Sequence, residues 1–378
     1  MSLSDTAPAP LARTPLHALH LALGAKMAGF AGYDMPINYP TGVLQEHLHT
    51  RAQAGLFDVS HMGQAWLRGR DAAARLETLV PGDLAALAPG RTRYTQFLNA
   101  EAGILDDLMA TRVSGSAGGE EVLFLVVNAG CKAQDFAHIA ASLPDLRLDV
   151  LPDRALIALQ GPQAAGALAK VLPGHETQPF MSMTQATWNG ATLYVSRSGY
   201  TGEDGYEISI PGDKGEAFAK ALLALPEAAR GGVGARGSRR RESGWSLPGD
   251  DTDARARPAE AQLMWSISKR RRAEGGFPGA ARLQAQIAEG PARLRVGIKP
   301  EGRAPAREGV EIHAQGRKVG VVTSGGFGPS VNGPVAMGYV EAAHSRPGTR
   351  VDLIVRGKSL PAEIVALPFT PARFYRGS

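Results

Sequence analysis

The sequence predicts an α+β protein of several domains with a separate β-barrel at its C-terminal end. Up to position 285, helix-like and strand-like segments are mixed without the regular alternation of a doubly wound sheet. After position 290 helical spacing stops, and short apolar segments follow one another between Gly/Pro turns. At 378 residues the chain exceeds one ordinary core, so two or three domains are expected.

The predicted domain boundaries follow these changes in pattern. Residues 1–13 are rich in Pro and Ala, lack the apolar core of a secretory signal and are poor in arginine, so we expect a short disordered lead. Residues 14–285 are expected to form one domain of two α+β subdomains. Residues 290–375 are expected to form the barrel.

Apolar spacing assigns the elements of the part that precedes the barrel. The predicted helices cover residues 15–27, 42–54, 71–80, 131–143, 163–172 and 214–225. The predicted strands cover residues 65–68, 94–98, 107–113, 121–128, 155–160, 191–196 and 206–210. Segment 30–40, rich in Gly, Tyr and Pro, is expected to be a loop. Six barrel strands are expected at residues 294–298, 310–313, 318–323, 336–340, 351–355 and 361–365.

Composition limits the class of protein. Hydrophobic residues at 44% and charged residues at 20% are typical of a folded soluble chain. No apolar run approaches the ~20 residues of a membrane span, so no membrane role is expected. The single cysteine, Cys131, excludes an intrachain disulfide and a site of several thiolates. We therefore expect a cytoplasmic protein.

The basic charge of the chain is concentrated in one segment. Residues 227–274 hold 11 Lys/Arg and 7 Asp/Glu, which gives +4 of the whole-chain +5. The clusters 239–241 and 269–272 could bind a polyanion. A solvated basic face explains them as well, and aromatic residues are not interleaved with them. We expect no nucleic-acid partner.

Two adjacent carboxylates, Asp106 and Asp107, end an apolar run. A carboxylate at a strand end can orient or deprotonate a ligand nitrogen, and burial would tune its pKa toward that role. Tyr94 precedes the pair at a spacing that could place its ring on the adjacent strand facing the same cavity, and Asn128 ends the next predicted strand. A turn or helix-capping role for the two aspartates remains the alternative.

A second polar segment, residues 200–207, spaces acidic and aromatic side chains with glycines. Tyr200 can stack on an aromatic ligand, and Glu207 can accept hydrogen bonds from ring N–H or amino groups. An ordinary hairpin with exposed acids remains the alternative. Together the two segments predict a site for a flat, nitrogen-rich, partly cationic ligand.

Three other patterns give weaker indications of a functional site. Segment 232–237 matches G-x-G-x-x-G, but the residues before it do not read as an apolar strand, so we do not expect a dinucleotide site. Arg236 within it could pair with a ligand carboxylate. The pairs His17/His20 and His47/His49 have no cysteine or matching spacing, so no metal is expected. Residues 57–63 are expected to form a buried hydrogen-bonded turn.

In this order, these elements resemble the aminomethyltransferase (T-protein) family of the glycine cleavage system. The resemblance covers nearly the whole chain and is specific in combination. It is carried by segments 14–16, 24–27, 30–32, 55–63 (GLFDVSHMG), 104–108 (ILDDL), 126–128, 159–162 (LQGP), 198–207 (SGYTGEDGYE), 323–325 and 374–378 (FYRGS).

The resemblance implies a fold with a central cavity that binds tetrahydrofolate, and lipoylated H-protein as the partner. The implied reaction moves the aminomethyl carbon from the lipoyl arm to tetrahydrofolate, releases ammonia and gives 5,10-methylenetetrahydrofolate. Asp107 looks like the catalytic carboxylate, which would stabilise the positive carbon left by loss of ammonia. The implied folate-site residues are Tyr94, Asn128, Tyr200, Glu207, Arg236 and Trp265.

One segment departs from the family pattern. Gly237 stands where the family has an acid, Arg239 and Arg241 stand where it has leucines, and Pro248 stands where it has a tyrosine. If those leucine positions face the core, each arginine there would cost several kcal/mol unless it reaches water or a partner. The expected fold is unaffected, whereas full activity does not follow from the resemblance.

Two other functions on the same scaffold remain as alternatives. A folate-dependent demethylase would share the carboxylate and the barrel. A non-catalytic folate-binding protein would keep a reduced site, whereas Asp107, Tyr200 and Glu207 are all present here.

Overall fold

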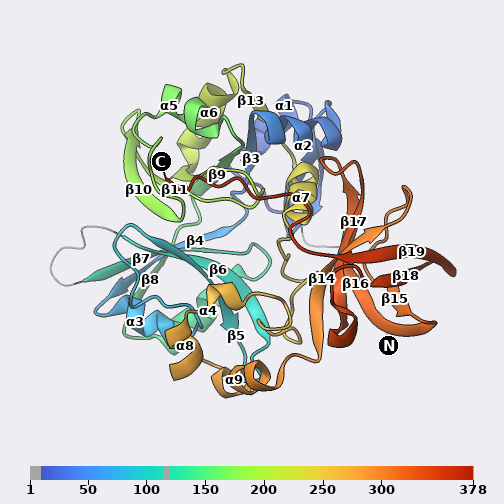
Figure 1. Ribbon diagram of the computed structural model, residues 1–378. Helices are drawn as coiled ribbons and strands as arrows, with labels where there is room; N and C mark the ends of the chain where they lie inside the picture. The colour runs from blue at the N-terminus through green and yellow to red at the C-terminus, as the bar shows by residue number, and fades with distance from the viewer. Residues whose placement is uncertain (1–9, 114–119, 378) are drawn as a thin grey trace, which may run out of the picture.

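The computed structural model describes residues 10–113 and 120–377, and Figure 1 shows two sheet-based lobes beside a barrel. The α+β class and the C-terminal barrel are confirmed. Most of the predicted lead, residues 1–9, lies outside the described residues. In its described part, Ala12 forms a β-bridge with Tyr33.

The first lobe is built on a five-stranded antiparallel sheet in the order β5-β6-β7-β4-β8. Its core side chains alternate along the strands with residues that face the centre of the molecule. The strands are β4 (Gly63–Gly69), β5 (Thr92–Leu98), β6 (Ile104–Arg112), β7 (Glu121–Val127) and β8 (Arg147–Val150), and the helices are α3 (Ala72–Glu77) and α4 (Lys132–Ser142).

The second lobe is built on a six-stranded sheet in the order β10-β11-β12-β9-β3-β13, in which only the short β13 pairs in parallel. Helices α5 and α6 pack on its apolar face. The strands are β3 (Ala54–Asp58), β9 (Arg154–Gln160), β10 (Ser182–Trp188), β11 (Ala191–Arg197), β12 (Gly205–Pro211) and β13 (Ala228–Arg230). The helices are α1 (His17–Ala22), α2 (Gly42–Ala52), α5 (Ala164–Val171) and α6 (Gly212–Leu223).

The third lobe is a closed barrel of six strands in the order β14-β17-β16-β15-β18-β19, filled by Val, Ile, Leu and Ala side chains. Its strands are β14 (Arg293–Pro300), β15 (Glu311–Ala314), β16 (Arg317–Gly328), β17 (Gly333–Glu341), β18 (Arg350–Val355) and β19 (Lys358–Val365), with the 3-10 turn η2 (Ala342–His344). The segment that leads to the barrel contains η1 (Met264–Ser266), α8 (Lys269–Glu274) and α9 (Ala280–Glu289).

The prediction of a loop at residues 30–40 is wrong. The chain forms a two-stranded hairpin, β1 (Lys26–Phe30) and β2 (Tyr33–Asn38). A two-stranded ribbon leaves one edge of each strand unpaired, so Pro36 is tolerated without an N–H to donate. The turn expected at residues 57–63 is present: Asp58 is buried and accepts hydrogen bonds from the Ser60 N–H and the Thr14 hydroxyl.

Helix α7 (Val233–Glu242) contains the G-x-G-x-x-G match, and here the reason for rejecting a dinucleotide site needs correction. A strand does precede the helix, because β13 ends at Arg230. However, the buried Glu46 carboxylate accepts a hydrogen bond from the Gly232 N–H at 2.9 Å. A protein anion therefore already occupies the position at the helix N-terminus where a phosphate would bind.

Arg239 and Arg240 of α7 are buried, whereas Arg236 and Arg241 are half-buried, so of positions 239 and 241 only the first faces the core fully. Arg239 is fully buried, and its Nη2 donates to Glu203 Oε1 and to the Thr201 carbonyl, each at 2.7 Å. Its Nε and Nη1 have no hydrogen-bond partner among the described residues. Burial lowers the pKa of Arg239 to about 10. Arg240 is also buried but is paired with Asp251 at 2.7 Å.

We predict that Arg239→Leu, alone or with Arg241→Leu, stabilises the fold by about 1–4 kcal/mol. Leucine removes the incompletely bonded guanidinium, and the Glu203 carboxylate keeps its ion pairs with Arg51 and Arg373. The free energy of unfolding in urea measures the effect.

The matched control is Arg240→Leu on the same helix. It leaves the buried Asp251 carboxylate without its cation, so the fold should lose about 3–5 kcal/mol. A loss of stability in the Arg239→Leu variant would show that this arginine is a favourable part of the core.

Candidate functional site

A cavity of about 730 Å³ lies where the two sheet lobes, α7 and the C-terminal segment meet; we call it the larger cavity. Every site residue predicted from the sequence lines it. They are Tyr94, Asp107, Asn128, Tyr200, Glu207, Arg236 and Trp265. Their roles stay predictions, but positions that are distant in the sequence line one cavity.

Asp107 is held in place by strand pairing in the first lobe. β5 and β7 flank β6, so Tyr94 and Asn128 come to either side of the carboxylate. The Tyr94 hydroxyl donates to Asp107 Oδ2 at 2.9 Å, and Asn128 Nδ2 donates to Asp107 Oδ1 at 2.6 Å. Both carboxylate oxygens are therefore fixed, and the turn or capping alternative for Asp107 is excluded.

Asp106 lies on the opposite face of the same strand and is fully buried. Asn128 also donates to it, through Nδ2 at 3.0 Å and through its backbone N–H at 3.3 Å. No lysine or arginine of the described residues forms an ion pair with Asp106 or Asp107. The two carboxylates therefore share neutral donors only.

This arrangement shifts the titration of the acids. Burial, and then the neighbouring Asp106, raises the pKa of Asp107 to about 7. Burial, and then its hydrogen bond with Asp106, raises the pKa of Asp135 to about 9. The raised pKa of Asp135 favours its protonated form, and the raised pKa of Asp107 brings the titration of this carboxyl close to neutral pH.

Flat aromatic surfaces border the carboxylate. Tyr94 stacks on Trp265 with ring centroids 5.2 Å apart and planes 19° apart, and Trp265 is 56% exposed. Phe180 and Phe374 form a second stack at 4.3 Å. These surfaces and the polar groups between them fit a planar heterocycle.

The second lobe supplies a second acid and a cation. Glu207 on β12 accepts from the Ser198 hydroxyl at 2.9 Å. Arg236 lies over the Tyr200 ring at 4.9 Å, and the Tyr200 hydroxyl donates to the Ser246 carbonyl. The Arg236 guanidinium donates no hydrogen bond to any described residue. Burial lowers the pKa of Arg236, whereas the negative charge of Glu207 acts to raise it.

The sequence analysis did not assign several residues of this cavity. Its rim includes Arg91, Phe180, Phe374 and Arg376. The last two belong to the FYRGS segment, which carried part of the family resemblance but received no role. An isolated Arg91 or Phe180 gives no signal in a single sequence, because neither forms a motif.

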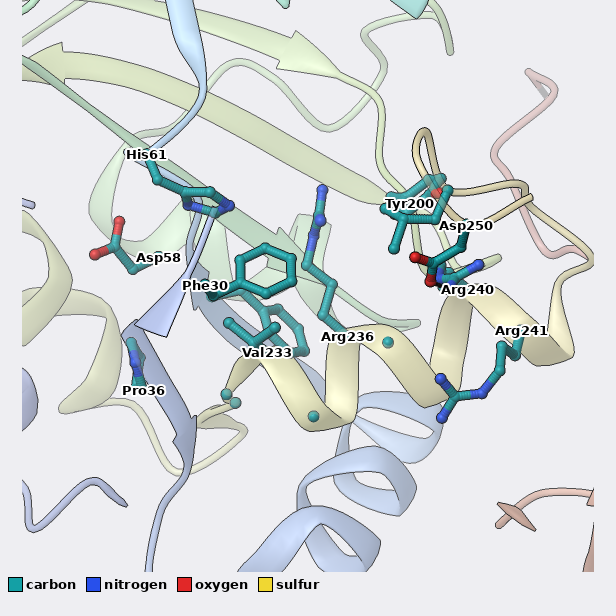
Figure 2. A pocket seen from close by; sticks show the side chains of 16 residues that line it. Phe30, Pro36, Asp58, His61, Tyr200, Val233, Arg236, Arg240, Arg241 and Asp250 are labelled. Carbon is teal, nitrogen blue, oxygen red and sulfur yellow. Dashed lines mark hydrogen bonds and ion pairs between the residues drawn. The ribbon is translucent and has the colours of Figure 1, made fainter. Parts of the chain in front are cut away.

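A second cavity of about 250 Å³ adjoins the larger one, and the two share Tyr200, Arg236 and Leu247 as lining residues. Figure 2 shows Arg236 between His61 on one side and Tyr200 on the other. His61 is buried, and its Nδ1 has no hydrogen-bond partner among the described residues. Burial, and then the charge of Arg236, lowers the pKa of His61 to about 4, so its imidazole is neutral at neutral pH.

The departures from the family pattern lie near both cavities. Gly237 lines the second cavity and Pro248 lines the larger one. Neither position removes a contact to Asp107, Tyr94 or Asn128. The departures therefore alter the α7 side of the site and leave the carboxylate side as the family resemblance predicts.

Many of the basic residues counted in the sequence form ion pairs and hydrogen bonds within the protein. Arg270 pairs with Glu77 and Asp83, and Arg271 donates to the Glu77 and Val80 carbonyls. Within residues 10–113 and 120–377, no group of three or more His, Cys, Asp or Glu side chains is placed to hold a metal ion. In the same residues no helix has the length and apolar character needed to cross a bilayer.

Comparison with known proteins agrees with this geometry. Residues 16–271 match the family model described as the GCVT N-terminal domain, and residues 293–370 match the glycine cleavage T-protein C-terminal barrel domain. The mitochondrial aminomethyltransferase of Gallus gallus is 43% identical, over 98% of this chain and 95% of that protein. The corresponding protein of Dictyostelium discoideum is 41% identical, over 96% and 94%.

A solved structure shows the same fold. The crystal structure of glycine cleavage system aminomethyltransferase T from Bartonella henselae superposes with a TM-score of 0.91 at 43% identity, covering 97% of this chain and 100% of that one. Sequence and structure thus agree along nearly the full length of the chain, and the chain belongs to the glycine cleavage T-protein (aminomethyltransferase) family.

Proposed function

We propose that the protein is the aminomethyltransferase of a glycine cleavage system. It moves the one-carbon unit from the S-aminomethyl-dihydrolipoyl arm of H-protein to tetrahydrofolate, releases ammonia and gives 5,10-methylenetetrahydrofolate. The observation that carries the proposal is Asp107, fixed by Tyr94 and Asn128 on the wall of a cavity bordered by stacked aromatic rings.

The residues of the larger cavity fit tetrahydrofolate. Its volume of about 730 Å³ is within the ~300–1,000 Å³ of small-molecule sites. The Tyr94–Trp265 stack offers a flat face, and the carboxylates of Asp107 and Glu207 can accept from ring nitrogens and amino groups. The cations Arg91 and Arg376 at the rim can attract the carboxylates of the folate tail.

When bound, tetrahydrofolate supplies the nitrogen nucleophile that captures the carbon. Asp107 in its ionised form stabilises the positive charge that develops as ammonia leaves. Tyr94 and Asn128 hold the carboxylate so that little reorganisation is needed at that moment. The aromatic walls exclude water and hold the reactants close together.

Other functions on this scaffold have weaker support. A folate-dependent demethylase would use the same carboxylate, and substrate turnover separates the two. A non-catalytic binding protein gives no reason for a carboxyl whose pKa is raised to about 7 and which faces the ligand cavity. The cytoplasmic location stays a prediction; the Gallus gallus and Dictyostelium discoideum relatives carry the word mitochondrial in their names.

We predict that Asp107→Asn lowers turnover by about 100-fold or more, since it removes the charge that faces the reacting carbon. The amide keeps the size of the side chain, so the dissociation constant for tetrahydrofolate should change by less than about threefold. Ammonia release with lipoylated H-protein measures turnover, and equilibrium titration measures binding. Equal turnover in the variant and the parent would remove Asp107 from the mechanism.

We predict an acidic limb near pH 7 in the pH profile of kcat/KM. The pKa of Asp107 is raised to about 7, so its carboxylate form is lost as the pH falls through that value. Asp106→Asn removes a neighbouring negative charge, so the pKa of Asp107 falls and the limb moves to lower pH. Asp145→Asn on the exposed surface is the control and should not move it. A limb at the same pH in all three proteins would assign it to another group.

A further inference from the structure

The last described residues, 366–377, cross from the barrel to the second lobe; we call them the C-terminal strap. Figure 1 shows this segment leaving the barrel and ending beside β10 and β11. Residues 374–377 form part of the wall of the larger cavity. Residues without regular secondary structure therefore form one side of that cavity, whereas strands, η1 and α7 contribute to the other sides.

The outer part of the strap has few backbone attachments. Between residues 371 and 377, the Arg373 N–H donates to the Gly202 carbonyl at 2.9 Å, and the Tyr375 N–H donates to Asp204 Oδ1 at 3.2 Å. No helix or strand of the described chain includes these residues. The Arg197 guanidinium adds a side-chain contact, 3.9 Å from the centroid of the Tyr375 ring. A segment with so few backbone hydrogen bonds opens locally at a lower free energy than the sheets.

One ion pair fastens the strap. Arg373 Nε donates to Glu203 Oε2 and its Nη2 donates to Glu203 Oε1, each at 2.8 Å, so the pair is bidentate. The Glu203 carboxylate is buried and also pairs with Arg51 and Arg239. A bidentate pair with a buried carboxylate is the strongest polar contact the strap makes, and it lies directly before the cavity wall in the sequence.

The side chains beyond this ion pair face ligand space. Phe374 stacks on Phe180 with the planes 17° apart, and the ring centroid of Trp245 lies 6.5 Å from that of Phe374. Arg376 is exposed and donates no hydrogen bond to any described residue. The Arg376 guanidinium lies over the Phe180 ring at 6.0 Å. An aromatic ring and an exposed guanidinium match a ligand with a flat ring and a terminal carboxylate.

We propose that the C-terminal strap is the movable wall of the folate site, with Arg373 as its positioning residue. The strap opens by separation of Arg373 from Glu203 and admits the folate. When it is closed, Phe374 lies against a ring of the ligand and Arg376 pairs with a carboxylate at its tail. The inference rests on the proposed function, because the ligand is tetrahydrofolate.

Arg373→Leu tests whether the Arg373–Glu203 ion pair holds the strap closed. It should not unfold the protein, since Glu203 keeps its ion pairs with Arg51 and Arg239. Dissociation of tetrahydrofolate should be about tenfold faster, and KM for tetrahydrofolate should rise more than kcat changes. Arg373→Lys keeps the charge but loses the bidentate geometry, so it should restore part of the affinity. Arg317→Leu removes an exposed barrel ion pair and is the control.

Hydrogen exchange gives a second measurement on the full chain. Saturating tetrahydrofolate should slow exchange in residues 371–377 by more than it slows exchange in β9, and Phe374→Ala should abolish that difference. The inference would be overturned by an unchanged dissociation rate of tetrahydrofolate in Arg373→Leu. It would also be overturned if tetrahydrofolate left the hydrogen-exchange rate of residues 371–377 unchanged. Either result would leave the proposed function intact. A parent protein that binds no tetrahydrofolate would overturn both.

Discussion

The site depends on one side-chain amide. Asn128 donates to the carboxylates of both Asp106 and Asp107, which lie on opposite faces of one strand, and no cation of the described residues neutralises either acid. Neighbouring negative charges in a buried sheet are unfavourable, and burial raises the pKa of Asp106, Asp107 and Asp135. The fold thus carries an electrostatic cost at the point where a positive carbon needs a fixed, partly desolvated carboxylate.

A second cluster of charges joins the second lobe, α7 and the barrel. Glu203 of the second lobe joins α2, α7 and the strap through three arginines. On the next turn of α7, Glu242 accepts from His47 of α2 and from the Ser330 N–H of the barrel. Helix α7 therefore connects the second lobe and the barrel, and Arg239 enters a network in which its partner acid, Glu203, is already paired with Arg51 and Arg373.

The sequence was sufficient for the class of fold and for the carboxylate side of the site. Apolar segments mark β6 and β7, and Asn128 directly follows β7 as expected, whereas β6 begins at Ile104, so Asp107 lies within the strand and not at its predicted start. It was not sufficient where spacing carries no signal. The hairpin at residues 26–38 was missed because Gly and Pro obscure a two-stranded ribbon. Phe374 was given no role because only the tertiary structure brings it to the cavity.

The central claim is that the Asp107 carboxylate, held by Tyr94 and Asn128, faces the ring system of the folate. A crystal structure of the protein with bound tetrahydrofolate tests this directly. The account predicts the pterin ring in the larger cavity, with a carboxylate oxygen of Asp107 turned toward the reacting nitrogens. A folate bound elsewhere, or Asp107 turned away from the ring, would contradict it.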